Sequence, residues 1–192
     1  MEETRKRILK SALETFSKLG YTGSTTREIA RLADITEVTL FRHFSSKEKL
    51  FEEVVHGSLP GPDFAKIILE AKKLEYSESL ESIARAFLDG LKHHEELIKV
   101  LYMEYRRHHE LMDKIYTALV NSLSILLAEY FKKLQDKGII RVINPLIMAK
   151  IFLSSLFGLF EEEIFFTKHM IGENTEVAVS VCIEIFVRGT KL

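Results

Sequence analysis

The sequence predicts an all-α protein, and three observations lead to this fold class. The 192 residues include nine Gly and three Pro, so long stretches lack residues that interrupt helices. Apolar residues recur with the i, i+3, i+4 spacing of amphipathic helices through most of the chain. Ser, Thr or Asn stands where several periodic segments begin, as expected of helix N-caps. We therefore expect about nine helices.

The N-terminal part contains a long helix followed by a short one. The apolar stripe of residues 4–19 predicts an amphipathic helix that ends at Gly20. Thr25 and Glu28 have the spacing of a capping box, which predicts a short helix to about Ala33.

Two more helices follow at once. Residues 34–36 break the short helix, and Thr36 can cap the next one. Ser45 and Glu48 again have capping-box spacing, which predicts a helix over about 46–58.

Residues 57–62, GSLPGP, gather four helix breakers and mark the best boundary in the chain. Beyond it, Asn144 and Pro145 give an N-cap with proline at the first helical position, and Gly138 and Gly172 separate helices. The predicted helices of this part cover residues 62–74, 77–92, 95–107, 109–136, 145–170 and 174–189. We expect an N-terminal domain over 1–46, a linking helix over about 46–58, and a helical domain within 47–192.

Composition and charge restrict the function. A single cysteine, Cys182, excludes an intramolecular disulfide framework. The N-terminus is charged and amphipathic rather than a signal peptide, and the apolar run 151–160 is shorter than the roughly 20 residues of a membrane span. Residues 1–50 hold ten Lys and Arg against seven Asp and Glu, which favours contact with an anion at this end. We expect a cytoplasmic protein that has no membrane partner.

Two short helices joined by a turn of three to four residues are typical of a helix-turn-helix domain. The second helix enters the major groove, so one side must be anchored in the domain while the other is exposed. Leu40 and Phe44 lie four residues apart and are expected to face inward, with Val38 and Phe41 nearby. The side chains left to face outward are those of Thr36, Glu37, Thr39, Arg42 and His43. This helix is therefore predicted to recognise double-stranded DNA.

Residues 5–55 resemble the DNA-binding region of the tetracycline-repressor (TetR) family of transcriptional regulators. The resemblance is carried by Ile8, Ala12, Phe16, Gly20, Tyr21, TTREIA at 25–30, Ala33, Thr36, Leu40, His43, Phe44 and SSKEKLF at 45–51. The rest of the chain is similar to the family in length, in helicity and in ending with two dimer-forming helices. The resemblance implies a homodimeric regulator, which we expect to be a repressor that binds a palindromic operator and is released by a small effector.

Side-chain chemistry and the resemblance together indicate the DNA contacts. They are Thr26, Arg27, Thr36, Glu37, Thr39, Phe41, Arg42, His43 and Lys47. Glu37 could accept a hydrogen bond from cytosine N4, and Lys47 could meet a phosphate beside free N–H groups. Capping alone would also account for Thr36, and the two roles are compatible.

Three positions depart from the family pattern. Asp34 stands where glycine is usual, many members also have glycine near Val38, and Phe41 stands where tyrosine is usual. Without a phenol hydroxyl, Phe41 cannot donate a hydrogen bond to a phosphate. We therefore expect Arg42 and Lys47 to carry more of the contact with the DNA backbone, helped by Thr26 or Arg27.

The last two predicted helices favour a homodimer. The helix over 145–170 is apolar around much of its circumference, so every side of it must be covered. Ser154 and Gly158 form a small-residue notch where another helix could approach. The predicted interface residues are Ile147, Ile151, Ser154, Gly158, Phe165, Val177, Val181 and Ile185. The alternative is that these helices are central within a monomer.

Helices between 62 and 136 could enclose an effector. The candidate lining residues are Phe64, Ile67, Phe87, Leu91, Ile98, Leu101, Tyr102, Tyr105, Tyr116, Leu123 and Phe157. Their aliphatic and aromatic character favours an elongated apolar or aromatic effector. Aromatic residues at helical spacing more often belong to an ordinary core.

No cofactor, metal or enzymatic activity is predicted. The pairs His93–His94 and His108–His109 are adjacent in sequence, so their side chains diverge by about 100° on a helix and chelate poorly. The sequence contains no glycine-rich phosphate loop, nucleophile elbow or His-Glu-x-x-His motif. Two other classes stay open: a helix-turn-helix regulator controlled by a protein partner, and a hydrophobic-ligand-binding module with a vestigial DNA-binding domain.

Overall fold

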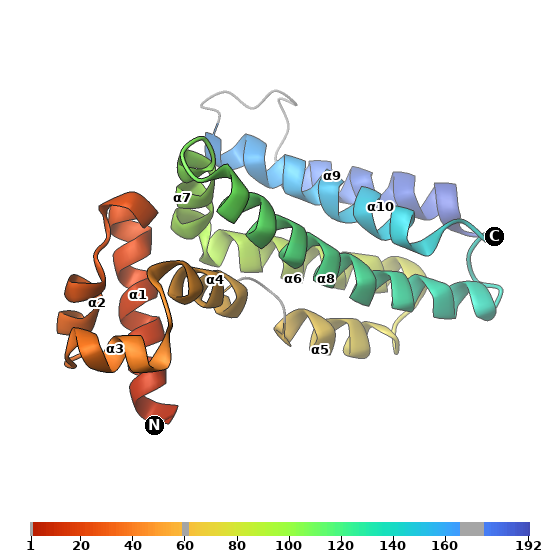
Figure 1. Ribbon diagram of the computed structural model, residues 1–192. Coiled ribbons are helices and arrows are strands. Elements are labelled where there is room, and N and C mark those ends of the chain that lie inside the picture. The colour runs from red at the N-terminus through yellow and green to blue at the C-terminus, as the bar shows by residue number, and fades with distance from the viewer. Residues whose placement is uncertain (1, 59–61, 166–174) are drawn as a thin grey trace. The chain divides into compact units, whose positions relative to one another are not determined.

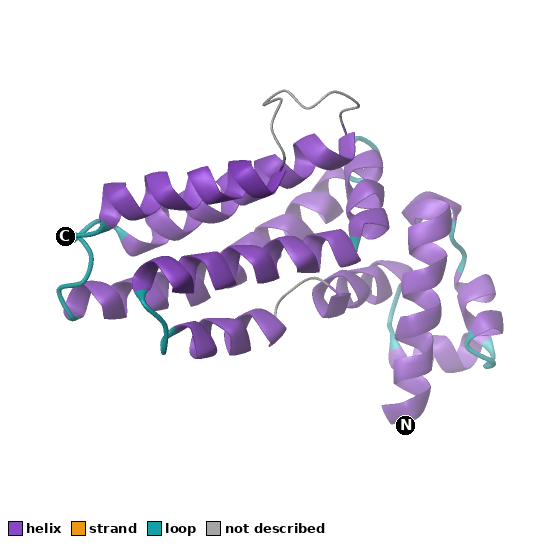
Figure 2. Ribbon diagram, turned by 180° about the vertical axis from the view of Figure 1, so that it is seen from behind, coloured by secondary structure: helices purple, strands orange, loops and turns teal. Residues whose placement is uncertain are grey.

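Ten α-helices make up most of the computed structural model, which describes residues 2–58, 62–165 and 175–192 (Figure 1). Figure 2 shows helices and loops but no strand in these residues. The all-α class is confirmed, with ten helices rather than about nine. They are α1 (Glu2–Gly23), α2 (Thr26–Leu32), α3 (Glu37–His43), α4 (Lys47–Ser58), α5 (Pro62–Ala71), α6 (Tyr76–His93), α7 (Glu95–Tyr105), α8 (His109–Asp136), α9 (Pro145–Phe165) and α10 (Thr175–Thr190).

The chain forms two compact units that interleave in sequence. The first is built from residues 1–59 and 94–119, and the second from residues 60–93 and 120–192. Thus α7 and the first part of α8 group with α1–α4, and α8 contributes to both units. The predicted division at residue 46 stays a prediction.

The first unit is organised around α1, which packs against α2, α4 and α7. Its apolar stripe is buried as the spacing predicts, with Ile8, Ala12 and Phe16 fully inaccessible. The Phe16 ring meets the Phe51 ring edge to face, with ring centroids 4.8 Å apart. Each large apolar side chain buried here contributes about 1.5–3 kcal/mol to stability, so α1 holds the neighbouring short helices in place.

Gly20 bends the end of α1. Its φ of +73° and ψ of 173° interrupt the helix, and one further turn runs to Gly23. A positive φ of this size lies in the region that favours glycine, so the predicted helix end at Gly20 is confirmed as a kink.

In the second unit, α6 packs against α5, α9 and α10, and α9 and α10 lie side by side (Figures 1 and 2). The Phe186 ring of α10 lies 5.8 Å from that of Phe131 and 4.9 Å from that of Phe152. The hydroxyl groups of Tyr76 and Thr190 are 2.7 Å apart and join α6 to the end of α10. Aromatic packing and a buried hydrogen bond therefore close this unit.

The connection from α8 to α9 follows the predicted punctuation. Gly138 has a φ of +66°, as expected where a helix stops. The Asn144 side chain accepts hydrogen bonds from the N–H groups of Leu146 (3.0 Å) and Ile147 (3.1 Å), which confirms the N-cap before Pro145.

Several predicted helix ends are displaced by a few residues. The helix expected over 62–74 ends at Ala71, and the one expected to 107 ends at Tyr105. Glycine and proline do not mark these ends, so periodicity alone placed them too late. The helix expected to 170 is described to Phe165, and the rest of that prediction, with Gly172, lies outside the described residues.

One described helix, α8, is long and apolar enough by composition to cross a membrane. Of its most apolar 18-residue window, 28% is buried within the structure, and a single helix that meets this criterion is weak evidence for a membrane span.

Candidate nucleic-acid interface

The helix-turn-helix segment has the local geometry that the sequence predicts. Thr25 precedes α2, and its side chain accepts a hydrogen bond from the Glu28 N–H (3.2 Å). Asp34 in the turn has a φ of +53°, a conformation that aspartate tolerates better than most residues other than glycine. Thr36 caps α3 by accepting from the Thr39 N–H (3.2 Å). Both caps satisfy N–H groups that a helix start leaves open.

Two predicted caps differ in detail. The Glu28 carboxylate pairs with Arg31 (2.8 Å) on the same exposed helix face. The cap of α4 is Ser46 rather than Ser45, because Ser46 Oγ accepts from the Lys49 N–H (3.2 Å) and the helix begins at Lys47. The two adjacent serines are equivalent by composition, and the backbone selects the second.

Leu40 and Phe44 anchor α3 as predicted, since both are buried. The Arg5 guanidinium of α1 lies 5.1 Å from the centre of the Phe44 ring, a cation–π contact. A helix of seven residues cannot maintain its own helicity, so these contacts hold it.

Val38 and Phe41 lie on the exposed side of α3, which corrects their expected place beside the anchors. Val38 is 65% exposed and Phe41 is 46% exposed. Successive helical residues turn by about 100°, so Val38 points nearly opposite to Leu40. Phe41 is among the predicted DNA contacts, and its exposure agrees with that role. Val38 is not among the predicted DNA contacts, although the spacing of about 100° per residue was enough to place it on the exposed side of α3.

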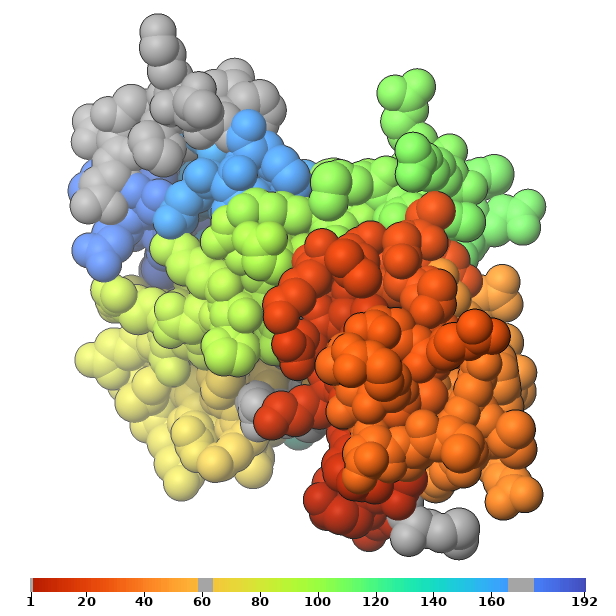
Figure 3. Space-filling view, turned by 90° about the vertical axis from the view of Figure 1, so that its left-hand side faces the viewer, coloured from red at the N-terminus to blue at the C-terminus, as the bar shows by residue number. Residues whose placement is uncertain are grey.

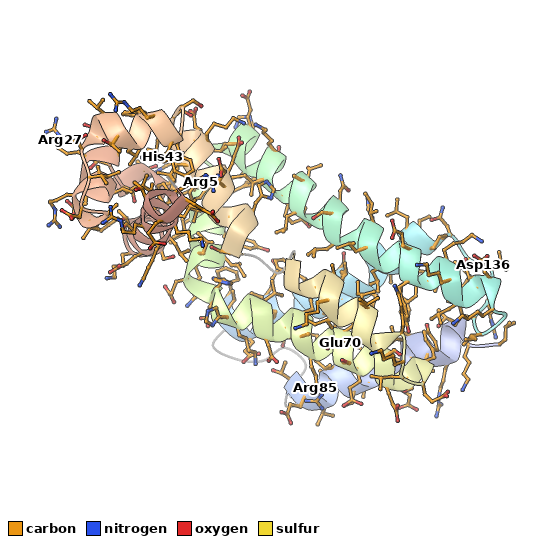
Figure 4. All side chains as sticks on the ribbon, turned by 90° about the horizontal axis from the view of Figure 1, so that it is seen from below. Arg5, Arg27, His43, Glu70, Arg85 and Asp136 are labelled. Atoms are coloured by element: carbon orange, nitrogen blue, oxygen red, sulfur yellow. The ribbon has the colours of Figure 1, made fainter. Side chains whose placement is uncertain are left out.

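The predicted DNA contacts come from the starts of α2 and α4 and from α3. Thr36 and Arg42 are exposed, whereas Thr39 and His43 are half-buried. The Arg27 side chain is 90% exposed, and Figure 4 shows it extending away from the ribbon, with His43 on the neighbouring helix. The surface of α2 and α3 (orange in Figure 3) faces solvent on the side shown.

The Glu37 carboxylate is bound by residues of α2. Its Oε1 accepts a hydrogen bond from Thr26 Oγ1 (2.5 Å), and Arg27 Nε lies 4.0 Å from its Oε2. These contacts join the start of α2 to the start of α3. A base contact by Glu37 would compete with them, and sequence spacing gave no signal of this pairing across two helices.

Lys47 opens α4 and lies against an aromatic ring. Its Nζ is 4.4 Å from the centre of the Tyr21 ring, which is a cation–π distance. Burial lowers the pKa of Lys47, while the charge of Glu104 acts in the opposite direction. The lysine is therefore held at the start of α4 rather than extended freely into water.

Glu52 joins α4 to α8 through Lys114, and Lys49 of α4 pairs with the same carboxylate. Its carboxylate accepts from Lys114 of α8 (2.6 Å) and from Lys49 of α4 (2.8 Å), and its side chain is 12% exposed. Burial alone would raise the pKa of Glu52, but the two lysine hydrogen bonds outweigh it and lower the pKa.

Acid is expected to loosen this attachment. Because the folded pKa of Glu52 is lowered, its contribution to stability is present above the ordinary carboxyl pKa of 4.5 and is lost as the pH falls through the folded pKa. Urea midpoints measured from pH 6 to pH 3 should fall less steeply for Glu52→Gln than for the natural protein. Glu96→Gln removes an exposed carboxylate and serves as control. Equal slopes for the Glu52 variant and the natural protein would contradict this assignment.

The predicted effector contacts divide between the two units. Ile98, Leu101, Tyr102, Tyr105 and Tyr116 belong to the first unit, and Phe64, Ile67, Phe87, Leu91, Leu123 and Phe157 belong to the second. Tyr102, Tyr105 and Tyr116 are exposed, whereas Phe64, Phe87 and Leu123 are buried. Their role as a lining stays a prediction.

The predicted dimer residues share one property: all eight are exposed. They are Ile147, Ile151, Ser154, Gly158 and Phe165 of α9, and Val177, Val181 and Ile185 of α10. The opposite side of α9 is buried through Phe152, Leu156 and Phe160. Thus α9 has one apolar side inside the protein and another on its surface, as its composition suggests.

Within the described residues, no group of three or more His, Cys, Asp or Glu side chains is placed to hold a metal ion. His108 instead contacts α1, with Nε2 3.2 Å from Thr22 Oγ1.

The sequence profile of the family described as bacterial regulatory proteins, tetR family, matches residues 8–54, which include α2 and α3. The chain is 31% identical over 191 residues to the HTH-type transcriptional regulator YvkB of Bacillus subtilis, covering 98% of each chain.

Solved structures share the fold over almost the whole chain. A TetR-family regulator from Mesorhizobium loti has a TM-score of 0.77 at 23% identity, covering 98% of this chain and 97% of that one. NalD of Pseudomonas aeruginosa, the secondary repressor of the MexAB-OprM multidrug efflux pump, has a TM-score of 0.70 at 20% identity, covering 99% and 98%.

Proposed function

This chain belongs to the TetR family of bacterial transcriptional regulators, and we propose that it is a homodimeric repressor which binds a palindromic operator through α3 and is released by a small apolar or aromatic effector. The family consists of transcriptional regulators rather than enzymes. Such a protein acts on DNA in the cytoplasm.

The division of α3 into two sides carries this proposal. Leu40 of α3 and Phe44 directly after it are buried, while Val38, Phe41 and Arg42 of this seven-residue helix are exposed. Exposed apolar side chains on a short, anchored helix can touch thymine methyl groups, and Arg42 can meet a phosphate or guanine. Lys47 and Arg27 supply positive charge at the neighbouring helix starts, where phosphates bind.

The exposed apolar side of α9 and α10 supports dimerisation. Monomeric proteins rarely expose contiguous apolar patches of this kind. A Cβ built on Gly158 would meet no atom within 4 Å, so the notch beside Ser154 leaves space for a partner helix. A twofold arrangement would place two copies of α3 about 34 Å apart, one helical turn of DNA.

Helix α8 offers a route from an effector to α4. It is continuous from His109 to Asp136 and contributes to both units. Its Lys114 contacts Glu52 of α4 (2.6 Å). Suppose that α8 can adopt two placements and that an effector binds the protein more tightly in one of them. The effector would then favour that placement of α8, shift α4 with it, and change the distance between the two recognition helices.

Salt dependence of DNA binding tests the proposed interface. The operator would first be selected from random DNA, and affinity would then be measured across salt concentrations. Lys47→Ala should lower the slope of log affinity against log salt by about 0.9 for each phosphate that the variant no longer neutralises. Phe41→Tyr should tighten binding by about 10- to 150-fold, because a hydroxyl that donates to a charged phosphate contributes about 1.5–3 kcal/mol.

Lys66→Ala, an exposed lysine of α5, is the control and should leave the slope unchanged. An unchanged slope for Lys47→Ala together with no gain for Phe41→Tyr would overturn the assigned contacts. If the natural protein bound no DNA even at low salt, the repressor proposal itself would fall.

A further inference from the structure

Among the residues that the structure describes, Glu104 of α7 is the one charged residue that is buried. Its exposed fraction is 6%. A buried carboxylate is costly unless several hydrogen bonds compensate for the lost water. The hydrogen-bond partners of Glu104 therefore indicate which part of the structure it stabilises.

The partners of Glu104 lie at the bent end of α1, 82 residues away in sequence. Oε1 accepts from the Thr22 backbone N–H (2.9 Å), and Oε2 accepts from Thr22 Oγ1 (2.7 Å). His108 Nε2 lies 3.9 Å from Oε2 and also contacts the Thr22 hydroxyl. Burial alone would raise the pKa of Glu104, but the Thr22 hydrogen bonds and the nearby His108 and Arg107 lower it. The carboxylate is thus stabilised in its charged form.

Gly20 is fitted to this carboxylate. A Cβ at residue 20 would lie 2.8 Å from Glu104 Oε1, closer than real Cβ contacts. The φ of +73° also favours glycine there. Glycine thus fits position 20 in two ways, by its backbone conformation and by the space it leaves for Glu104, and Thr22 two residues on donates both hydrogen bonds.

Between Gly20 and Thr22 stands Tyr21, whose ring joins α1 to α4. The ring lies 4.9 Å from His108, edge to face, and 5.0 Å from Phe51 of α4. Lys47 Nζ lies 4.4 Å from its centre. A path of direct contacts therefore runs from Glu104 to Thr22, along the chain to Tyr21, and through its ring to Lys47.

We propose that Glu104 is a positioning residue for DNA binding: by fixing Thr22 it holds the Tyr21 ring, and the ring sets the place of Lys47 beside the DNA backbone. This inference rests on the proposed function, because it assigns Lys47 to a phosphate contact. It adds that α7, outside the helix-turn-helix segment, determines the strength of that contact.

A double-mutant cycle separates this role from a general effect on folding. The natural protein, Glu104→Ala, Lys47→Ala and the double variant would be titrated with a mixed-sequence duplex of about 30 base pairs, three helical turns, across salt concentrations. Glu104→Ala should weaken binding several-fold and reduce the salt slope by as much as Lys47→Ala does, about 0.9 per phosphate. In the Lys47→Ala background it should change neither quantity. An equal loss in both backgrounds, or no loss in either, would overturn the proposal.

Three further variants sharpen the test. Glu96→Ala removes an exposed charge from the same helix and should bind like the natural protein. Glu104→Gln should recover part of the affinity, because an amide oxygen can still accept from the Thr22 N–H. Thr22→Val removes only the hydroxyl. Combined with Lys47→Ala in the same kind of cycle, it should give smaller losses of affinity and of salt slope than Glu104→Ala does. It replaces Glu104→Ala in the cycle if circular dichroism shows that Glu104→Ala does not fold.

The outcomes also separate this inference from the proposed function. If the natural protein bound no duplex at low salt, both would fall. If Lys47→Ala weakened binding while Glu104→Ala and Thr22→Val did not, the positioning role alone would be overturned.

Discussion

Replacing Ile151 with glutamate is expected to convert the proposed homodimer into monomers. Ile151 is 55% exposed on α9, in line with Ile147 and Ser154 on the same side. Twofold symmetry would bring two copies of the new carboxylate into one apolar interface, and each buried unpaired charge costs several kcal/mol. The dimer dissociation constant should therefore rise by ~10³-fold or more. Analytical ultracentrifugation over a range of concentrations measures this shift.

Ile125→Glu is the matched control. Ile125 is the same residue type, is 52% exposed and lies on α8 in the same unit, and it is not one of the predicted interface residues. It should leave the dimer intact. The monomeric Ile151→Glu protein should also lose most of its affinity for a palindrome, because two linked recognition helices bind far more tightly than one. A dimer that survives Ile151→Glu but not Ile125→Glu would place the interface elsewhere.

Local patterns predicted most of the fold. The stripe of α1 and the caps at Thr25, Thr36 and Asn144 depend on residues close together in the sequence. Such features are readable because their physics is local. The exposed side of α9 was predictable for the same reason, since one helix apolar all round needs cover on both sides.

Features that depend on distant partners were not predictable. Glu104 carries no local sign of burial, because its hydrogen-bond partner Thr22 comes from another helix. The place of Glu37 on α3 predicts a DNA contact, whereas Thr26 of α2 already holds its carboxylate. The interleaved units have the same origin: periodicity identifies α7 as a helix but says nothing about which neighbour buries it. The DNA contacts therefore stay predictions made from local sequence, and the distant residues that support them were not predicted.

Leu40→Ala is expected to release the recognition helix while the rest of the protein stays folded. Leu40 is fully buried, and truncating a buried leucine costs about 2–5 kcal/mol, a large part of the 5–15 kcal/mol that usually stabilises a domain. Because α3 has seven residues and little helicity of its own, the loss should appear there first. Amide hydrogen exchange, followed residue by residue, should show α3 losing protection while α6 and α9 of the second unit keep theirs.

Val38→Ala on the same helix separates anchoring from recognition. Val38 is 65% exposed, so its truncation should change stability by less than about 0.5 kcal/mol, as for surface positions in general. If Val38 touches a thymine methyl, the variant should instead lose preference at one base pair of the selected operator, worth about 1–3 kcal/mol. Leu40→Ala should weaken binding to every sequence alike. Equal losses of protection in both variants would mean that α3 is not anchored through Leu40, and the two-sided helix that carries the proposed function would have to be abandoned.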